Sequence, residues 1–283
     1  MSSEKIHIER NTVQETLVIP LLARKICTDV FGDFFSDQKA VELMGRLDYN
    51  FGDVEKISRS FIQRFGALEV AARQKAFSWE VREYLKKHPR ASVVNLGCGL
   101  DQTAESCDNG TCRIYNIDFP DIIEIRNKLI PAGERVTNIS SDLNDPGWFE
   151  KVARDDGAVF FASGVFYYFT PEQIRDMVNG MAAYFHDGVL AFDIAGKLAA
   201  KTGIKAWIKQ AGIEGVFTAF YVNSVRSEIE PWLKHAAASS RGYMTGYFDL
   251  KERSISGIYR FLARTAADGL MRMKIVKIKF DPA

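Results

Sequence analysis

Five short runs of strand-forming residues alternate with helical segments in the middle of the chain, and this alternation constrains the fold more than any other feature. The runs cover residues 92–97, 112–118, 135–142, 157–163 and 188–194. Amphipathic segments at 121–130, 146–155 and 171–185 separate most of them. Strands that alternate with helices form right-handed βαβ units, so the pattern predicts a mostly parallel sheet covered by helices on both faces.

The two ends of the chain differ from this middle part. The first 90 residues carry apolar residues at helical spacing over 12–30 and 54–88, with no strand alternation of any length. After residue 194 we expect a basic amphipathic insert (196–225), a helix (227–237), a strand (242–248), a helix (254–270) and a closing strand (274–280). The sequence therefore predicts a helical N-terminal extension over residues 1–90 and a seven-stranded α/β domain over residues 91–283, together forming one compact unit.

The helix at 171–185 has the most complete set of local signals. Thr170 and Gln173 form a capping box, and Pro171 takes the first helical position. Apolar residues at helical spacing, Ile174, Met177, Val178, Met181 and Phe185, predict the buried face.

Composition excludes several classes of protein. Lys and Arg number 37 against 36 Asp and Glu, and this balance argues against a nucleic-acid partner or a charged membrane surface. The longest apolar run, 158–169, is too short to span a bilayer, and MSSEKIHIERN has no apolar core of a secretory signal. Four cysteines without a second metal-binding pair indicate reduced thiols, so we expect a cytoplasmic protein with no metal site.

The stretch SVVNLGCGLDQ (92–102) lies where an open parallel sheet binds its ligand, at the carboxyl end of the first strand. Gly97 and Gly99 would let the backbone approach a bulky ligand, because neither carries a Cβ. Asp118, which lies 19 residues beyond Gly99, ends the next strand. A carboxylate at this position accepts hydrogen bonds from both hydroxyls of a ribose, so the pattern predicts a nucleoside-containing cofactor.

The residues after the glycines favour one nucleoside over another. Gln102 stands where a dinucleotide-binding loop has its third glycine, and Asp101 places a negative charge where a pyrophosphate would lie. S-adenosylmethionine has an ammonium and a sulfonium but no phosphate. The loop therefore favours S-adenosylmethionine over NAD as the cofactor.

Four motifs in order and spacing resemble the leucine carboxyl methyltransferase superfamily, nearest to its bacterial polyketide-type O-methyltransferase branch. They are NLGCGLD (95–101), NIDFP (116–120), SDLND (141–145) and SGVFYYF (163–169), and the resemblance runs from about residue 60 to the C-terminus. It implies a Rossmann-like class I S-adenosylmethionine-dependent methyltransferase fold, with the helical extension over the active site.

The resemblance also assigns the methionine end of the cofactor. Arg73, on the helix before the first strand, matches an arginine that pairs with the cofactor carboxylate, and a guanidinium suits that role because it binds a carboxylate through two hydrogen bonds. Gly97 and Asp101 match the loop around the methionine moiety. The alternative for Arg73 is a solvated helix arginine.

The same resemblance assigns the nucleoside end. Asp118 matches the ribose ligand, Asp142 the residue that holds the exocyclic amine of adenine, and Leu143 the residue against the adenine ring. A helix N-cap is the alternative role for Asp142. Two positions depart from the family pattern: Gln102 replaces a threonine and Ser163 replaces an acidic residue.

The acceptor is less well specified. A carboxylate acceptor is already ionised and needs no general base, whereas a hydroxyl would benefit from one. The stretch after the fourth strand offers Tyr167 and Tyr168 but no histidine, and His186 is expected to be exposed. We therefore expect a carboxylate or an acidic hydroxyl, with Tyr168 as a candidate substrate contact whose alternative is a place in the core.

The resulting hypothesis is an S-adenosylmethionine-dependent O-methyltransferase of a small molecule, with the helices around Tyr49 and Phe51 as a candidate lid. Three alternatives stay open: methylation of a protein C-terminal carboxylate, an NAD-dependent oxidoreductase, and a cofactor-binding protein without activity. The sequence leaves the identity of the acceptor and the oligomeric state open.

Overall fold

The computed structural model describes residues 5–9, 13–52, 54–201 and 220–282. The N-terminal elements are β1 (Ile6–His7), the 3₁₀ helix η1 (Val13–Leu17), α1 (Val18–Val30), α2 (Gln38–Gly45), β2 (Leu47–Asp48), α3 (Val54–Arg59) and α4 (Phe61–Leu85). The βα part comprises β3 (Ser92–Leu96), α5 (Thr103–Ser106), β4 (Arg113–Asp118), α6 (Pro120–Leu129), β5 (Val136–Ser140), η2 (Pro146–Lys151), β6 (Ala158–Ala162), η3 (Phe166–Tyr168), α7 (Pro171–Tyr184) and β7 (Val189–Ile194). The last elements are α8 (Lys197–Lys201), α10 (Val225–Glu228), η4 (Glu230–Trp232), β8 (Ala236–Gly242), α11 (Gly257–Leu262), the π-helix η5 (Ala263–Leu270) and β9 (Lys274–Phe280).

A seven-stranded sheet forms the centre of the molecule, in the order β5-β4-β3-β6-β7-β9-β8. The strands β5, β4, β3, β6 and β7 pair in parallel, whereas β9 pairs antiparallel with both β7 and β8, so the expected mostly parallel seven-stranded sheet is confirmed. The register pairs Leu96 with Ile117 on one side and with Ala162 on the other. The carboxyl ends of β3, β4 and β6 therefore lie level with one another, and the loops that follow them meet at one edge.

Helices cover both faces of the sheet, because the side chains of each strand alternate between two apolar clusters. Val93 and Phe161 pack against α1, α4 and α6 on one face. Val94 and Phe160 pack against η2 and α7 on the other, around the fully buried Trp148. The predicted capping box of α7 is present, with the Thr170 hydroxyl and the Gln173 side chain bonded to each other's backbone N–H.

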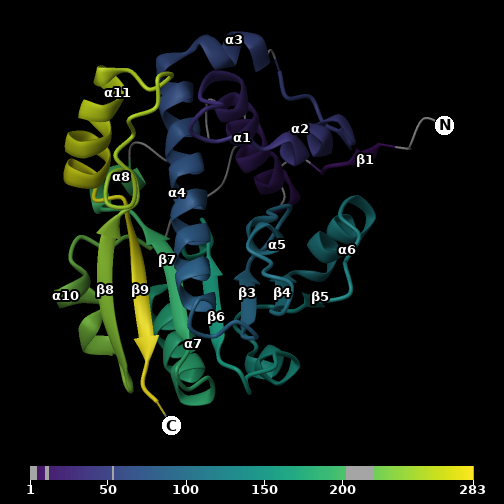
Figure 1. Ribbon diagram of the computed structural model, residues 1–283, viewed down its shortest axis with the longest axis vertical. Coiled ribbons are helices and arrows are strands. Elements are labelled where there is room, and N and C mark those ends of the chain that lie inside the picture. Colours follow the sequence, from purple (N-terminus) through teal and green to yellow (C-terminus); the bar gives the residue numbers. More distant parts are fainter. Residues whose placement is uncertain (1–4, 10–12, 53, 202–219, 283) are drawn as a thin grey trace.

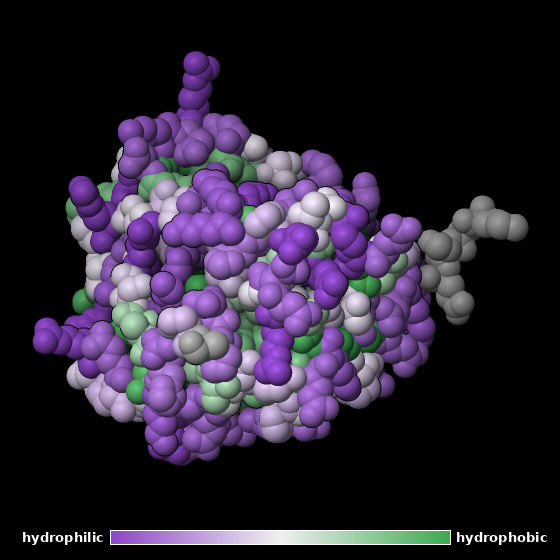
Figure 2. All heavy atoms as spheres, turned by 60° about the horizontal axis from the view of Figure 1, so that its bottom comes forward, coloured by the Kyte–Doolittle hydropathy of each residue, from purple (hydrophilic) through white to green (hydrophobic). Residues whose placement is uncertain are grey.

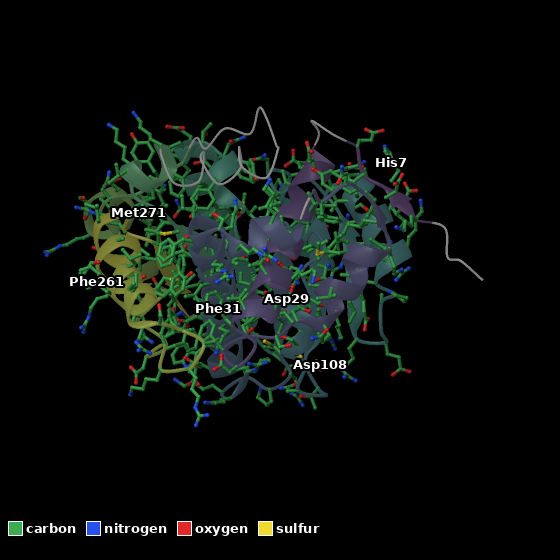
Figure 3. All side chains as sticks on the ribbon, turned by 90° about the horizontal axis from the view of Figure 1, so that it is seen from above. His7, Asp29, Phe31, Asp108, Phe261 and Met271 are labelled. Atoms are coloured by element: carbon green, nitrogen blue, oxygen red, sulfur yellow. The ribbon has the colours of Figure 1, made fainter. Side chains whose placement is uncertain are left out.

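The helices α1, α2 and α3 lie over the carboxyl ends of the parallel strands, whereas α4 runs down along one face of the sheet and α11 lies beside its upper part (Figure 1). In the view from above, Phe31 at the end of α1 lies between the N-terminal helices and α11, which carries Phe261 (Figure 3). The Phe31 ring meets that of Tyr259 on α11 edge-on, at 5.4 Å between centroids. The N-terminal helices and residues of the C-terminal part thus share one apolar cluster.

The expected helix at 227–237 and strand at 242–248 are wrong. The helix α10 ends at Glu228, Pro231 lies in the first turn of the short 3₁₀ helix η4, and the edge strand β8 occupies Ala236–Gly242 instead. The small residues of β8 carry little strand propensity, so pairing with β9 determines the strand. Residues after Gly242 form a turn, because the Asp268 carboxylate accepts the backbone N–H groups of Met244 and Thr245.

Smaller differences concern the other connections. The segment expected to be helical over 146–155 is a 3₁₀ helix over Pro146–Lys151, and the N-terminal region contains a short parallel pair, β1 with β2. The helix expected over 254–270 is confirmed as α11 followed by η5. Most of the expected insert at 196–225 (residues 202–219) lies outside the described residues.

Hydrophilic residues cover most of the face drawn in Figure 2, and hydrophobic ones show only between them. Within the described part of the chain, no helix is both long and apolar enough to cross a membrane.

Candidate active site

The glycine loop between β3 and α5 is held in a conformation that requires its glycines. Gly97 and Gly99 have φ of +62° and +47°, values that other residues rarely adopt. A Cβ on Gly97 would lie 2.6 Å from Val165 Cγ2, and one on Gly99 would lie 2.9 Å from Leu17 Cδ2. The loop therefore lies between the N-terminal extension and the turn that follows β6.

Asp118 joins the end of β4 to this loop. One carboxylate oxygen accepts the Gly99 N–H at 2.8 Å, and the other accepts the Phe119 N–H at 2.8 Å. Burial raises the pKa of Asp118, although both backbone bonds oppose this shift. Each oxygen has a second lone pair, so the carboxylate can still accept hydrogen bonds from two ribose hydroxyls.

Asp101 points inward and builds the turn. It accepts hydrogen bonds from the Thr103 hydroxyl at 2.8 Å and the Thr103 N–H at 3.2 Å, while the Arg24 guanidinium of α1 lies 3.9 Å away. Burial raises the pKa of Asp101. The side chain thus shapes the loop and links it to the N-terminal extension, and its contact with the methionine moiety stays a prediction.

Arg126 of α6, which the sequence motifs did not predict, binds the backbone of the same loop. One guanidinium nitrogen donates to the carbonyls of Gly99 and Asp101 at 2.8 and 2.7 Å, and the other donates to Glu105 at 2.6 Å. The side chain is fully buried. The sequence contained a signal for this role, because Arg126 lies on the apolar stripe of α6 between Ile122 and Leu129. A buried arginine needs several hydrogen-bond acceptors around it.

Arg73 of α4 reaches the other side of the site. Its Nη1 forms an ion pair at 2.8 Å with Asp193 of β7, which is almost wholly buried, and the second oxygen of Asp193 accepts the Gly164 N–H at 2.6 Å. The Nε atom of Arg73 is buried without a partner among the described residues. The solvated-arginine alternative is therefore wrong, and the guanidinium keeps a donor for a ligand carboxylate.

Asp142 and Leu143 follow β5 at the same edge. Asp142 is exposed and accepts the backbone and side-chain N–H groups of Asn144 at 2.9 and 3.0 Å. Asp145, rather than Asp142, caps the helical turn η2, so the N-cap alternative for Asp142 is wrong. Leu143 is buried against Trp148, whose indole N–H donates to the Leu143 carbonyl.

The aromatic stretch after β6 divides between core and surface. Phe166, Tyr167 and Phe169 are buried, whereas Tyr168 keeps 50% of its surface exposed. Burial nevertheless raises the pKa of Tyr168, and Arg73 and Asp193 also affect it. Tyr168 is thus half exposed and lies close enough to the Arg73–Asp193 pair for both charges to affect its pKa.

These residues fit S-adenosylmethionine. Asp118 can hold the ribose, and the unpartnered Arg73 Nε can hold the amino-acid carboxylate. The described residues form no group of three side chains that could hold a metal ion. The strand order, the glycine loop and the acid that ends the second strand of the βα part define a class I S-adenosylmethionine-dependent methyltransferase.

The comparison with known families agrees and is more specific. The leucine carboxyl methyltransferase family matches residues 18–182, and the chain belongs to that family. It is 30% identical over 183 residues to the tetracenomycin polyketide synthesis O-methyltransferase TcmP of Streptomyces glaucescens, covering 64% of this chain and 65% of that protein. The match thus spans slightly less than two thirds of the relative, and the family model confirms the predicted family.

Solved structures support the fold. A methyltransferase from Thermobifida fusca YX aligns with a TM-score of 0.57 at 12% identity, covering 92% of this chain and 94% of that one. The plantazolicin methyltransferase BamL, solved with S-adenosylhomocysteine, aligns with a TM-score of 0.51 at 14% identity, covering 95% of this chain and 100% of that one. These two structures support the predicted fold, and the family match supports the predicted class of enzyme, a methyltransferase.

Proposed function

We propose that this protein transfers the methyl group of S-adenosylmethionine to an oxygen of a small molecule, either a carboxylate or an acidic hydroxyl. The observation that carries the proposal is the Asp118 carboxylate, tied to the Gly99 N–H at 2.8 Å and still able to accept from a ribose. The relative TcmP, whose name describes an O-methyltransferase, supports oxygen as the acceptor atom.

The chain's own residues contribute mainly by positioning. S-adenosylmethionine supplies an activated methyl group, and transfer to a nucleophile in line with the carbon–sulfur bond needs alignment above all. Asp118 would fix the ribose, Arg73 the carboxylate, and Asp142 with Leu143 the adenine. Tyr168, beside the Arg73–Asp193 pair, would then contact the acceptor.

The N-terminal extension is proposed to exclude water from this site. Leu17 packs on Gly99, and the Arg24 guanidinium donates to the Leu100 carbonyl at 3.4 Å. The loop that would hold the cofactor is therefore covered by residues of the extension. Limited proteolysis should cut the segment around Tyr49 and Phe51 more slowly when S-adenosylhomocysteine is bound; unchanged cleavage would count against a lid.

Calorimetric titration with S-adenosylhomocysteine tests the cofactor assignment. Wild type should bind it, and Asp118→Ala should bind about 100-fold more weakly or worse, because each hydrogen bond to a charged group contributes about 1.5–3 kcal/mol. Asp121→Asn, a change of a neighbouring carboxylate on α6, is the control and should bind as wild type does. Binding of NADH in place of S-adenosylhomocysteine would favour the oxidoreductase alternative.

A further inference from the structure

The last strand of the sheet, β8, has one edge without a partner. In the part of the chain that the structure describes, β8 pairs only with β9, and it ends the strand order (Figure 1). In an antiparallel pair, alternate residues bond to the partner strand and the others point away from it. At one end of β8 the Asp281 N–H donates to the His235 carbonyl, and at the other the Tyr243 N–H donates to the Met273 carbonyl. The odd-numbered residues of β8 therefore bond to β9.

Three residues of β8 consequently point their backbone groups away from the sheet: Ala236, Ala238 and Ser240. Each offers an N–H donor and a carbonyl acceptor. Gly242 ends this series, because its carbonyl accepts the Gly246 N–H at 3.0 Å. Sheet edges are usually protected by lysine, by proline or by a bulge, and the sequence AAASSRG of β8 contains neither lysine nor proline. The edge can therefore accept a further strand.

A groove of about 370 Å³ runs beside this edge, between the two last strands and α4. The side chains that line it come from β8, β9, α4 and the turn after β8: Trp79, Glu80, Ala237, Ala238, Ser239, Ser240, Arg241, Tyr247, Ile275, Lys277 and Lys279. The register sets both lysines opposite Ala237 and Ser239, whose short side chains leave room for them to reach toward the edge. The groove is therefore continuous with the unpaired backbone.

Positive charge exceeds negative charge in this groove. Its charged residues are Arg241, Lys277 and Lys279 against one carboxylate, Glu80. One oxygen of Glu80 pairs with Lys277 Nζ at 2.8 Å, and the other accepts the Tyr247 hydroxyl at 2.7 Å. Among the described residues, no ion pair neutralises Arg241 or Lys279. The groove is therefore complementary to an anionic ligand.

The cations also have the spacing of a strand. Lys277 and Lys279 are two residues apart on one face of β9, which separates them by about 7 Å. Arg241 continues the row on β8, two positions beyond the residue opposite Lys277. Its guanidinium lies over the rings of Trp79 and Tyr247, at 5.1 and 4.9 Å from their centroids, which orders the side chain without neutralising its charge. A strand beside β8 would repeat its own side chains at the same interval.

We propose that β8 and the groove bind an acidic peptide segment in extended conformation, which adds a further strand to the sheet. Its backbone pairs with the three outward-facing residues of β8, and carboxylates at alternate positions meet the three cations. A second copy of this chain fits less well, because edge-to-edge pairing would bring its own row of cations to the same face. The groove begins about 9 Å along α4 from Arg73, the rise of six residues, so the proposal is independent of the proposed function.

Calorimetric titration with capped synthetic peptides about as long as β8 tests this. A peptide of alternating glutamate and threonine should bind, and one with lysine in place of every glutamate should bind about tenfold more weakly or worse. In a strand the N–H groups of alternate residues face one edge. Of two peptides N-methylated on every glutamate or on every threonine, one should therefore lose binding and the other should keep it, although both carry the same charge.

Variants of the protein separate backbone pairing from charge. Ala238→Pro removes an outward N–H without breaking the ladder to β9 and should weaken binding about tenfold, whereas Ala238→Ser keeps the N–H and should bind as wild type does. Lys279→Gln combined with Arg241→Gln should also weaken binding about tenfold and reduce its dependence on salt. Lys128→Gln, on α6, is the matched control for charge. The temperature of thermal unfolding, which needs no ligand, shows whether each variant is folded.

Four outcomes would overturn the proposal. They are no binding of the glutamate peptide, equal binding of the lysine peptide, equal binding of both N-methylated peptides, and a wild-type dimer that Ala238→Pro converts to a monomer. The third would mean that the groove holds an anion without strand pairing, and the fourth, measured by analytical ultracentrifugation, that a second copy occupies the edge. Binding that depends on the glutamates, on one set of peptide N–H groups and on both kinds of variant would establish it.

Discussion

The two halves of the candidate site are built in different ways. The cofactor half, over β3 and β4, joins residues close in sequence: Asp118 and Gly99 are 19 residues apart, and Arg126 and Gly99 are 27 apart. The acceptor half, over β6 and β7, which would also hold the carboxylate of the cofactor through Arg73, joins distant residues: Arg73 and Asp193 are 120 residues apart. The first half follows from one βα unit and its neighbour, whereas the second exists only when α4, β7 and η5 pack together.

Removal of Arg126 tests how far the cofactor half depends on one buried side chain. Arg126→Gln would leave Glu105 and two backbone carbonyls without their charged donor, so we expect a loss of about 3–5 kcal/mol in the free energy of unfolding. Urea denaturation measures it. Arg175→Gln, which alters an exposed arginine of α7, should cost less than about 0.5 kcal/mol. If Arg126→Gln loses no more free energy of unfolding than this control, the glycine loop does not depend on Arg126 for its stability.

The contrast between the halves explains what the sequence could predict. Short motifs identified the glycine loop, Asp118 and the parallel sheet, because the strand–loop–helix pattern is local. Arg126 was missed although it lies on the apolar stripe of α6, since its acceptors are backbone carbonyls that leave no mark in a sequence. Asp193 was missed because nothing local distinguishes an aspartate that becomes buried only through tertiary packing.

The C-terminal region shows the same limit at the level of secondary structure. The sequence AAASSRG of β8 has few strand-forming residues, and only its pairing with β9 makes it a strand. The turn after it depends on Asp268, 24 residues away from Met244. The strand at 242–248 was therefore predicted from aromatic residues that in fact make tertiary contacts: Tyr247 donates to Glu80, and Phe248 packs on Phe34.

Gly97 is the place where the two halves touch, and substitution there should have the next largest effect. Gly97→Ala adds backbone strain of about 1–2 kcal/mol at its positive φ and a clash with Val165. Gly110→Ala, which has a positive φ but open space around it, should show the strain alone. Thermal unfolding of both variants, with and without Val165→Ala, separates the two costs. If Val165→Ala does not reduce the cost of Gly97→Ala, the halves are not coupled through this contact.

Asp142 tests the cofactor half without disturbing the core, because its side chain is exposed. If it accepts the adenine amine, Asp142→Ala should weaken binding of S-adenosylhomocysteine about tenfold, the value of one hydrogen bond to a charged group at the low end of its range. Wild type should lose a similar factor with S-inosylhomocysteine, which lacks that amine, and Asp142→Ala should not discriminate between the two ligands. If wild type and Asp142→Ala discriminate equally between the two ligands, Asp142 does not bind the adenine amine and only forms the turn with Asn144.

Tyr168 provides the complementary test of the acceptor half, with the smallest expected effect. The side chain is half exposed beside Arg73 and is not assigned to the cofactor, so Tyr168→Phe should leave affinity for S-adenosylhomocysteine unchanged. Loss of one neutral hydrogen bond should raise KM for a hydroxy acid about two- to tenfold, and Tyr168→Ala should raise it further through lost packing. Tyr184→Phe, on α7, is the matched control and should change neither constant. If a variant at Tyr168 weakens cofactor binding instead, the two halves share this residue.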